Sequence, residues 1–246
     1  NEFLPDVLGY EDFDAELMEN IKQVVAHRQR KGGHKDLFET ITCDCPLTLG
    51  KRLSLRFRAE HEEGGIEGVP HMDGLVDIDL TYGEGPYESF EIILGKIAHC
   101  EGGSQALEGV FYDLGSGTGK LVVAAAILGS FKRVCGIEVM EDLHQVATGL
   151  QAIWAQNDEA QALRPGLQLE FLHTGLNEAD WSDATICLSN CMCFSPQLLK
   201  DMALQAEEMP SGAFFVTSGV PLMSNWFEVV AEAMLEHPYY IHRKIG

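Results

Sequence analysis

The chain has 246 residues, of which 46% are apolar and 22% are charged. These proportions are those of an ordinary globular protein that can bury a substantial core. Acidic residues number 38 against 17 basic ones, so the formal net charge is −21 with the histidines neutral. DNA affinity comes largely from neutralising phosphates with lysine and arginine. The charge therefore excludes a surface covered in phosphate-binding cations, makes direct DNA binding doubtful, and favours basic partners.

No stretch of the sequence approaches the roughly 18 consecutive apolar residues of a membrane span. The first residues, Asn-Glu-Phe-Leu, lack the basic and apolar regions of a signal peptide. Seven cysteines are an odd number in a chain too large to need disulfides, which favours a reduced, intracellular protein. Cys43-x-Cys45 and Cys191-x-Cys193 lack the spacing of common zinc sites, so we predict no metal site.

The first 80 residues differ in character from the remainder and predict a small N-terminal cap, built from a helix and a hairpin. Apolar residues recur at helical spacing over residues 14–27, which predicts a helix there. Leu53, Leu55 and Phe57 alternate with polar residues, which is typical of a strand with one wet face. Residues 58–74 show little periodicity and predict a loop. We therefore predict two units, a cap over residues 1–80 and a main domain over residues 81–246.

From Tyr87 onward, helical and strand-like patterns alternate. Strands are predicted over residues 110–114, 133–139, 167–173, 184–189 and 213–217. Helices are predicted over residues 87–98, from a glycine turn to residue 128, from residue 140, and from Ser195-Pro196 to about residue 209, where serine and proline form a strong start signal. This alternation predicts an α/β fold with a parallel sheet covered on both faces. The tail predicts a helix over residues 226–235 and an edge strand over residues 239–242.

Three glycines at alternate positions, 115 to 119, form a turn between a predicted apolar strand and a predicted helix. Glycines let the backbone bend tightly and let a ligand approach its N–H groups. A P-loop does not fit, because Leu114 stands at the first glycine position and Leu121 at the Ser/Thr position. A dinucleotide fingerprint does not fit either, because its third glycine would fall at Lys120.

The segment Asp113-Leu114-Gly115-Ser116-Gly117-Thr118-Gly119 instead resembles the first motif of class I S-adenosylmethionine-dependent methyltransferases. In that family the second strand ends in an acid that holds the ribose hydroxyls, and Gly136-Ile137-Glu138 supplies one. An ionised carboxylate only accepts hydrogen bonds and can accept from both hydroxyls. The resemblance implies a Rossmann-like fold with a mostly parallel sheet. It also implies S-adenosylmethionine as cofactor, with S-adenosylhomocysteine as product.

Two further segments narrow the family: Thr81-Tyr82-Gly83-Glu84-Gly85, and Leu188-Ser189-Asn190-Cys191-Met192-Cys193-Phe194. With the glycine turn, over about residues 75–222, they resemble the Dot-one (disruptor of telomeric silencing) family of histone lysine methyltransferases. Those enzymes carry a Tyr-Gly-Glu loop, an Asp-Leu-Gly-Ser-Gly turn and an asparagine-aromatic motif after the fourth strand. The resemblance implies methyl transfer to a lysine of a basic protein, with a histone in chromatin preferred, and hence a nuclear location.

The resemblance also implies roles for particular residues. Asn190 would lie beside the incoming lysine, and it and Tyr82 would be the catalytic residues. Glu138 would hold the ribose. The cofactor-binding positions would be Tyr82, Gly83, Glu84, Gly85, Asp113, Gly115, Gly117, Lys120, Glu138, Gly175, Leu176 and Asn190.

The chain departs from the family pattern at several of these positions. Family members usually have threonine at Gly85, glutamine at Lys120, and a Gly-Asp step where this chain has Thr174-Gly175-Leu176. Many carry Asn-Asn-Phe in place of Asn190-Cys191-Met192, so the catalytic asparagine either maps to Asn190 or is lost at Cys191. Two alternatives follow: a cytoplasmic methyltransferase of a non-histone basic protein, or a catalytically weak module that binds the cofactor or a histone.

The chemistry itself makes modest demands on the protein. A neutral amine attacks the methyl group of a sulfonium in line, so alignment does most of the work. Lysine has an ordinary pKa near 10.4 and must lose its proton, which an apolar channel promotes by desolvating the ammonium. Candidate aromatics for such a channel, or for the core, are Phe194, Trp181, Phe214 and Phe215.

Overall fold

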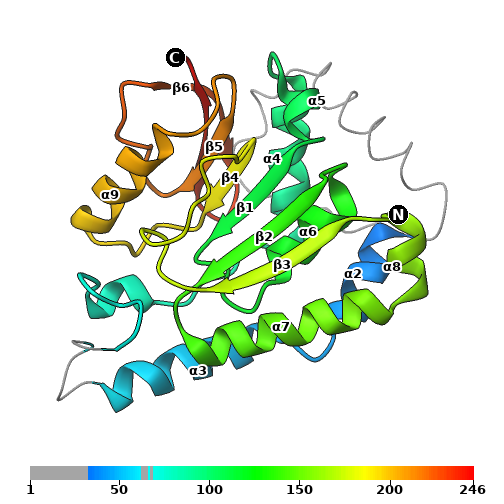
Figure 1. The fold of residues 1–246 in the computed structure, drawn as a ribbon, viewed down its shortest axis with the longest axis vertical. Helices are drawn as coiled ribbons and strands as arrows, with labels where there is room; N and C mark the ends of the chain where they lie inside the picture. The colour runs from blue at the N-terminus through cyan, green and yellow to red at the C-terminus, as the bar shows by residue number, and fades with distance from the viewer. Residues whose placement is uncertain (1–32, 62–65, 67–68) are drawn as a thin grey trace.

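The structure is a computed structural model that describes residues 33–61, 66 and 69–246. The helix predicted over residues 14–27 lies outside the described residues. The described residues form one seven-stranded sheet in the order β3-β2-β1-β4-β5-β7-β6 (Figure 1). The strands are β1 Val110–Leu114, β2 Arg133–Glu138, β3 Gln168–His173, β4 Ile186–Ser189, β5 Phe214–Ser218, β6 Phe227–Met234 and β7 Pro238–Lys244.

Helices flank this sheet and precede it in the chain. They are α2 His34–Thr42, α3 Leu47–Glu60, the 3-10 helix η2 Asp77–Leu80, α4 Tyr87–His99, α5 Gly103–Ala106, α6 Lys120–Leu128, α7 Glu141–Gln156, α8 Asp158–Leu163 and α9 Pro196–Ala206. The predicted alternation of strands and helices from Tyr87 to Thr217 is confirmed, with boundaries that move by up to three residues. Ser195 caps α9 as predicted, because its side chain accepts a hydrogen bond from the Leu198 N–H.

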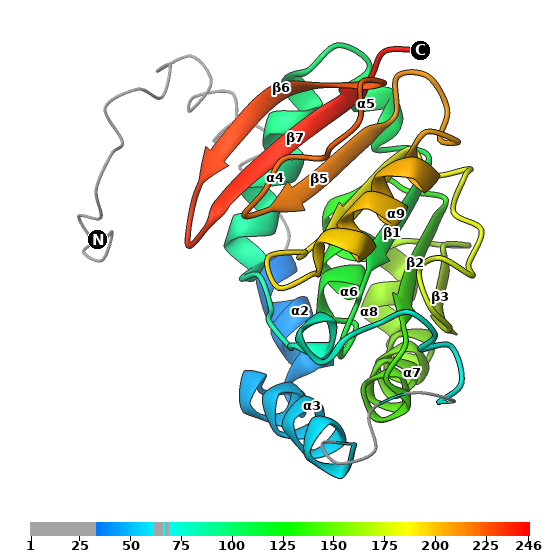
Figure 2. The ribbon, with the colours of Figure 1, turned by 90° about the vertical axis from the view of Figure 1, so that its left-hand side faces the viewer.

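Strands β1 to β5 are parallel, and β7 runs antiparallel between β5 and β6. Adjacent residues of a strand point to opposite faces, so the sheet has two cores. Phe111 belongs to the core that α4 and α6 cover, whereas Tyr112 belongs to the core that α9 covers. Figure 2 shows α9 on one side of the sheet and α4 and α6 on the other. The α/β fold with a mostly parallel sheet covered on both faces is therefore confirmed.

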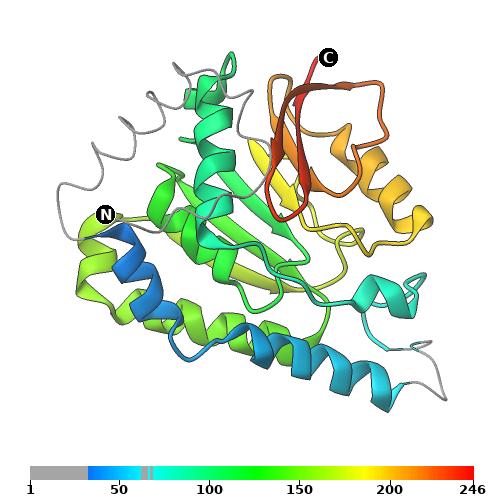
Figure 3. The same cartoon turned by 180° about the vertical axis from the view of Figure 1, so that it is seen from behind.

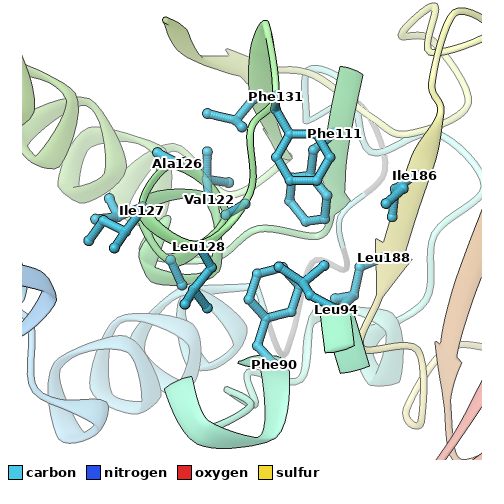
Figure 4. Packing of buried hydrophobic residues seen from close by; sticks show 14 of the residues in the cluster. Phe90, Leu94, Phe111, Val122, Ala126, Ile127, Leu128, Phe131, Ile186 and Leu188 are labelled. Carbon is cyan, nitrogen blue, oxygen red and sulfur yellow. The ribbon is translucent and has the colours of Figure 1, made fainter. Parts of the chain in front are cut away.

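Helix α6 is apolar on every side because other elements surround it. All seven residues from Val122 to Leu128 are buried. Figure 4 shows its side chains against Phe111 of β1 and against Phe90 and Leu94 of α4. The absence of a polar face is what a fully enclosed helix requires. This packing fixes the glycine turn, because α6 begins where the turn ends.

The strand and hairpin predicted around Leu53 are wrong, because those residues lie in the middle of α3. Leu53 and Phe57 are four residues apart and therefore share one face of the helix, where they pack against Met72, Leu80, Met140 and Leu143. Leu55, which completed the alternation, is 61% exposed. Three alternating apolar residues are compatible with a strand or with a helix. The packing of α3 along α7 stabilises the helix (Figure 3).

The helix predicted over residues 226–235 is also wrong, since residues 227–234 form strand β6. Alanine, glutamate and methionine favour a helix in isolation, but pairing of β6 with β7 overrides this preference. A register shift between Val229 and Ala231 breaks the strict alternation that would have indicated a strand. The strand around Tyr239 is confirmed, but not at the edge: β6 is the edge strand, and β7 lies inside it.

The strand order reverses between β1 and β4. From β1 the chain proceeds outward to β2 and β3, then crosses back to place β4 on the other side of β1. Ligands of open α/β sheets bind at the carboxyl ends of the strands where such a reversal occurs. In this chain the glycine turn follows β1 and Asn190 follows β4, so both lie at that point.

Candidate active site

A cavity of about 860 Å³, part of which opens to solvent, lies over the carboxyl ends of strands β1 to β4. Its floor comes from the turn after β1, Glu138 at the end of β2, residues 174–178 after β3, and Asn190 after β4. Its opposite wall comes from residues between His71 and Gly83, which the chain folds back over the sheet.

The glycine turn approaches this wall very closely. Gly117 has φ +56°, a conformation that favours glycine, and a Cβ there would lie 2.5 Å from Cε2 of Tyr82. On the far side of the same ring, a Cβ at Gly50 of α3 would lie 2.2 Å from Cζ. The Tyr82 ring is thus held between two glycines, one from the turn and one from α3.

We expect Gly50→Ala to lower the free energy of unfolding by roughly 1–3 kcal/mol, as overpacking does. Gly149 provides a matched control, because it is also a helical glycine and nothing lies within 4 Å of a Cβ built there. Gly149→Ala should raise the free energy of unfolding by about 0.5–1 kcal/mol, since alanine favours a helix over glycine. Urea denaturation of both variants measures the difference, and stabilisation by both changes would contradict the packing of Tyr82 against α3.

Tyr82 is also the centre of a polar network. Its hydroxyl donates to Glu84 and lies 3.0 Å from Oγ1 of Thr118, which in turn donates to Glu84 over 3.0 Å. Lys120, the first residue of α6, forms an ion pair with Glu84. Burial and the neighbouring Glu84 carboxylate raise the pKa of Tyr82, so the phenol keeps its proton. The network fastens the Tyr-Gly-Glu loop to the glycine turn and α6.

Glu138 presents a buried carboxylate to the cavity. Its Oε2 accepts a hydrogen bond of 2.7 Å from the Gly117 N–H, and its Oε1 accepts one of 2.8 Å from the Met140 N–H. Burial raises the pKa of Glu138, and these backbone N–H groups oppose the rise because they favour the ionised form. Each carboxylate oxygen can accept a second bond, which leaves acceptors for two hydroxyl groups of a ligand.

Asp113 lies beneath the turn rather than in the cavity wall. It is 2% exposed, and burial followed by the charge of Glu138 raises its pKa to about 8. An unfolded aspartate has a pKa near 3.9. Between about pH 4 and pH 8 the folded chain therefore binds more protons at Asp113 than the unfolded chain does. The free energy of unfolding consequently falls as the pH rises through this range.

We expect Asp113→Asn to remove the fall in the free energy of unfolding that the ionisation of Asp113 causes as the pH rises. The free energy of unfolding of the variant, relative to wild type, should rise between pH 5 and pH 8 by about 1 kcal/mol or more, since one pKa unit corresponds to about 1.4 kcal/mol. Urea denaturation at the two pH values measures it, with the exposed Asp44→Asn as control. A difference between variant and wild type that does not change with pH would contradict a raised pKa at Asp113.

Asn190 stands at the junction of two cavities. It lines the large cavity and also a second, narrow one, whose other walls are mostly apolar side chains of α4, Leu121, Leu188 and Tyr239. The Ser218 hydroxyl donates to Asn190 Oδ1 over 2.6 Å, which turns the amide nitrogen toward Gly83. Cys191 is fully buried, and its thiol lies against the Ser218 carbonyl. The position next to Asn190 therefore does not reach either cavity.

The structure brings most of the predicted site residues together. Those that line the large cavity are Tyr82, Gly83, Gly115, Gly117, Glu138, Gly175, Leu176 and Asn190. Glu84, Gly85, Asp113 and Lys120 surround it without lining it, and Gly85 lines the small cavity instead. Among the candidate aromatics, Phe194 lines the large cavity, whereas Trp181, Phe214 and Phe215 belong to the core.

Sequence reasoning missed several residues of the site. Gly50 holds the Tyr82 ring, and Tyr239 forms a wall of the small cavity. His71 lines the large cavity with a φ of +66°, and its Nδ1 lies 2.7 Å from Glu178 Oε2 on the opposite side. None of these positions carries a local sequence signal, because each is defined by a contact with a distant part of the chain.

In the part of the chain that the structure describes, no group of three or more histidine, cysteine, aspartate and glutamate side chains could hold a metal ion. Among residues 33–61, 66 and 69–246, no helix is long and apolar enough to cross a bilayer.

The residues present fit S-adenosylmethionine. Gly115 and Gly117 both line the cavity, so the backbone of the turn forms part of the surface that a ligand would contact. Glu138 offers carboxylate oxygens of the kind that accept from a ribose diol. Leu176 and Ile137 add apolar surface to the cavity of about 860 Å³.

The chain is similar to several solved structures. A putative methyltransferase from Escherichia coli is 12% identical, with a TM-score of 0.50 over 72% of this chain and 98% of that one. A magnesium protoporphyrin IX methyltransferase from Synechocystis, with bound S-adenosylhomocysteine, is 13% identical, with a TM-score of 0.48 over 67% and 91% of the two chains. A putative RNA methyltransferase from Pyrococcus horikoshii is 16% identical, with a TM-score of 0.46 over 81% and 100%. The first of these likenesses shows the Rossmann-like fold of class I methyltransferases.

The sequence comparison is more specific than the fold. The model of the family described as histone methylation protein DOT1 matches residues 78–233, which is more than half of the chain. A search of curated proteins found no match. The chain belongs to the DOT1 family and is by that membership an S-adenosylmethionine-dependent methyltransferase of histone lysine, as the resemblance in its sequence predicts.

Proposed function

We propose that this chain methylates a histone lysine with the residues described above: the large cavity holds S-adenosylmethionine, and the small cavity admits the lysine side chain. The observation that carries this assignment is that Asn190 lines both cavities. A residue at that junction can contact the cofactor on one side and the attacking amine on the other. Asn190 itself, and not Cys191, then supplies the amide at the reacting centre.

Different residues of the chain bind and orient the cofactor and desolvate the substrate lysine. The glycine turn and the Glu138 carboxylate, which both line the large cavity, orient the cofactor, which when bound supplies an electrophilic methyl group on a sulfonium. Phe90, Ile93 and Leu188 form apolar walls that desolvate the lysine and lower its pKa. In the transfer, the neutral amine would form the N–C bond as the C–S bond of the bound cofactor breaks, and the proton of the product ammonium would leave to solvent.

Residues before position 80 belong to the site in this proposal. We divide the chain into a cap over residues 1–80 and a methyltransferase domain over residues 81–246. Gly50 of α3 packs against Tyr82, and His71, Asp79 and Leu80 line the large cavity. The cap therefore forms one wall of the cofactor site.

The charge of the chain supports a basic protein substrate. A net charge of −21 attracts histones and repels the DNA around them. We infer that the chain acts in the nucleus on histone surfaces exposed to it, and that direct contact with DNA contributes little to binding.

The experiment that tests the substrate compares nucleosomes, free histones and a whole-cell lysate with tritiated S-adenosylmethionine. The proposal predicts label on histone protein, and strong competition by salt because the attraction is electrostatic. Label on a non-histone protein with histones silent would reject the histone assignment while leaving the chemistry intact.

A further inference from the structure

The turn between β6 and β7 places a carboxylate at the rim of the small cavity. The Ser89 hydroxyl of α4 donates to Glu236 Oε2 over 2.7 Å, and the Tyr239 hydroxyl donates to Oε1 over 2.8 Å. Ser89 and Tyr239 both line the cavity. A Cβ at Gly85, which also lines it, would lie 3.2 Å from the Tyr239 oxygen and 3.9 Å from Glu236 Oε1. Figure 3 shows this turn, in red, beside the start of α4.

The charge of this carboxylate has no cation beside it in the described residues. The ion pairs found there do not include Glu236. A carboxylate has about four lone-pair sites, of which the two hydroxyl groups use two. Glu236 is exposed, so solvent and a ligand can reach its carboxylate, which lies next to two residues of the cavity wall. Burial and Glu236 both raise the pKa of Tyr239, which therefore stays a hydrogen-bond donor.

A carboxylate at this position suits the binding of a lysine side chain before it enters the small cavity. A lysine arrives as an ammonium ion with three N–H donors, and apolar walls disfavour that charge. A carboxylate at the entrance compensates for the first loss of water with charge-assisted hydrogen bonds. Deeper in the cavity the amine is neutral, and the carboxylate has no further part in the transfer.

We propose that Glu236 is the residue that binds the substrate ammonium at the entrance of the small cavity and so selects a lysine side chain. This inference rests on the proposed function, because it takes the small cavity to be the lysine channel. Glu236 then acts on substrate binding and leaves the chemical step to Asn190.

A purely structural role would have a different signature. Glu236 also fastens the β6–β7 turn to α4 through Ser89. Glutamine at this position keeps one carbonyl oxygen that can accept from one of the two hydroxyl groups, and its NH2 group can donate to the oxygen of the other, but the charge is lost. If fastening were the whole role, Glu236→Gln would bind substrate as wild type does.

The test measures methyl transfer to free histones for wild type, Glu236→Gln, Glu236→Asp and the control Glu232→Gln. Glu232 is exposed on β6, so its change removes the same net charge away from the cavity. We expect Glu236→Gln to raise KM for histones about tenfold, which corresponds to about 1.4 kcal/mol. Its kcat should stay within about twofold of wild type, and the Kd for S-adenosylmethionine should not change. Glu236→Asp should give an intermediate KM, and the control should match wild type.

An unchanged KM in Glu236→Gln, or an equal rise in Glu232→Gln, would overturn the assignment of Glu236. A fall in kcat or in cofactor affinity with KM unchanged would show a structural role and overturn it as well. Circular dichroism measures the melting temperature of each variant. If Glu236→Gln melts far below wild type, the KM of Glu236→Asp for histones is used instead, and an unchanged KM would overturn the assignment. Wild type is assayed first. If wild type labels no lysine, the proposed function fails. If wild type is active and the Glu236 variants have the same KM, only the role of Glu236 is refuted.

Discussion

Gly117→Ala should raise the dissociation constant for S-adenosylmethionine at least about a hundredfold, which corresponds to about 2.7 kcal/mol. The added Cβ would lie 2.5 Å from Tyr82 Cε2, and the ring cannot retreat because the α3 backbone at Gly50 touches its other side. The turn must then move, and with it the N–H group that holds Glu138. Calorimetric titration with S-adenosylmethionine measures the effect.

Gly166→Ala is the matched control for this change. Gly166 also has a positive φ, +79°, but nothing lies within 4 Å of a Cβ built there. Both variants bear the backbone strain of a left-handed alanine, of roughly 1–2 kcal/mol, and only Gly117→Ala adds the clash at the site. Gly166→Ala should therefore bind the cofactor as wild type does. Binding by Gly117→Ala within threefold of wild type would show that the glycine turn is not the cofactor site.

Asn190→Ala should lower kcat about a hundredfold, in the usual range for a lost polar group at a reacting centre. The Kd for S-adenosylmethionine should change less than about fivefold, because the glycine turn and Glu138 remain in place. Steady-state rates with histones and calorimetry with the cofactor separate the two quantities. Ser218→Ala should have a smaller effect, about tenfold on kcat, since it removes only the hydrogen bond that orients the amide.

Asn225→Ala is the control for Asn190, because Asn225 is an exposed asparagine outside both cavities. It should leave kcat and the cofactor Kd unchanged. If Asn190→Ala kept more than half of the wild-type kcat, the amide would have no part in the chemistry, and the junction of the two cavities would lose its assigned role.

The centre of the sheet and its cofactor edge could be predicted because their signals are local. The turn after β1 is defined by glycines whose backbone conformation no other residue readily adopts. Glu138 follows from the end of β2, and the Ser195 cap of α9 follows from adjacent residues. In each case the sequence near the residue is enough to determine its structure.

Predictions failed where distant contacts decide the structure. The residues around Leu53 alternate in polarity, yet packing on α7 makes them a helix. β6 contains helix-favouring residues, yet β7 pairs with it. The contact of Gly50 with Tyr82 and the position of Glu236 against Ser89 both join segments far apart in the chain. Tertiary packing of this kind overrides the secondary-structure preference of the local sequence, so the local sequence does not predict it.

The most direct test of the account identifies the amino acid that receives the methyl group. The chain is incubated with histones and S-adenosylmethionine labelled in the methyl group, the protein is hydrolysed, and the labelled residue is identified by chromatography. We expect labelled methyllysine from wild type and at most about 1% of that amount from Asn190→Ala. Label in another amino acid, or no label on protein while the cofactor binds, would contradict lysine methylation at the junction of the two cavities.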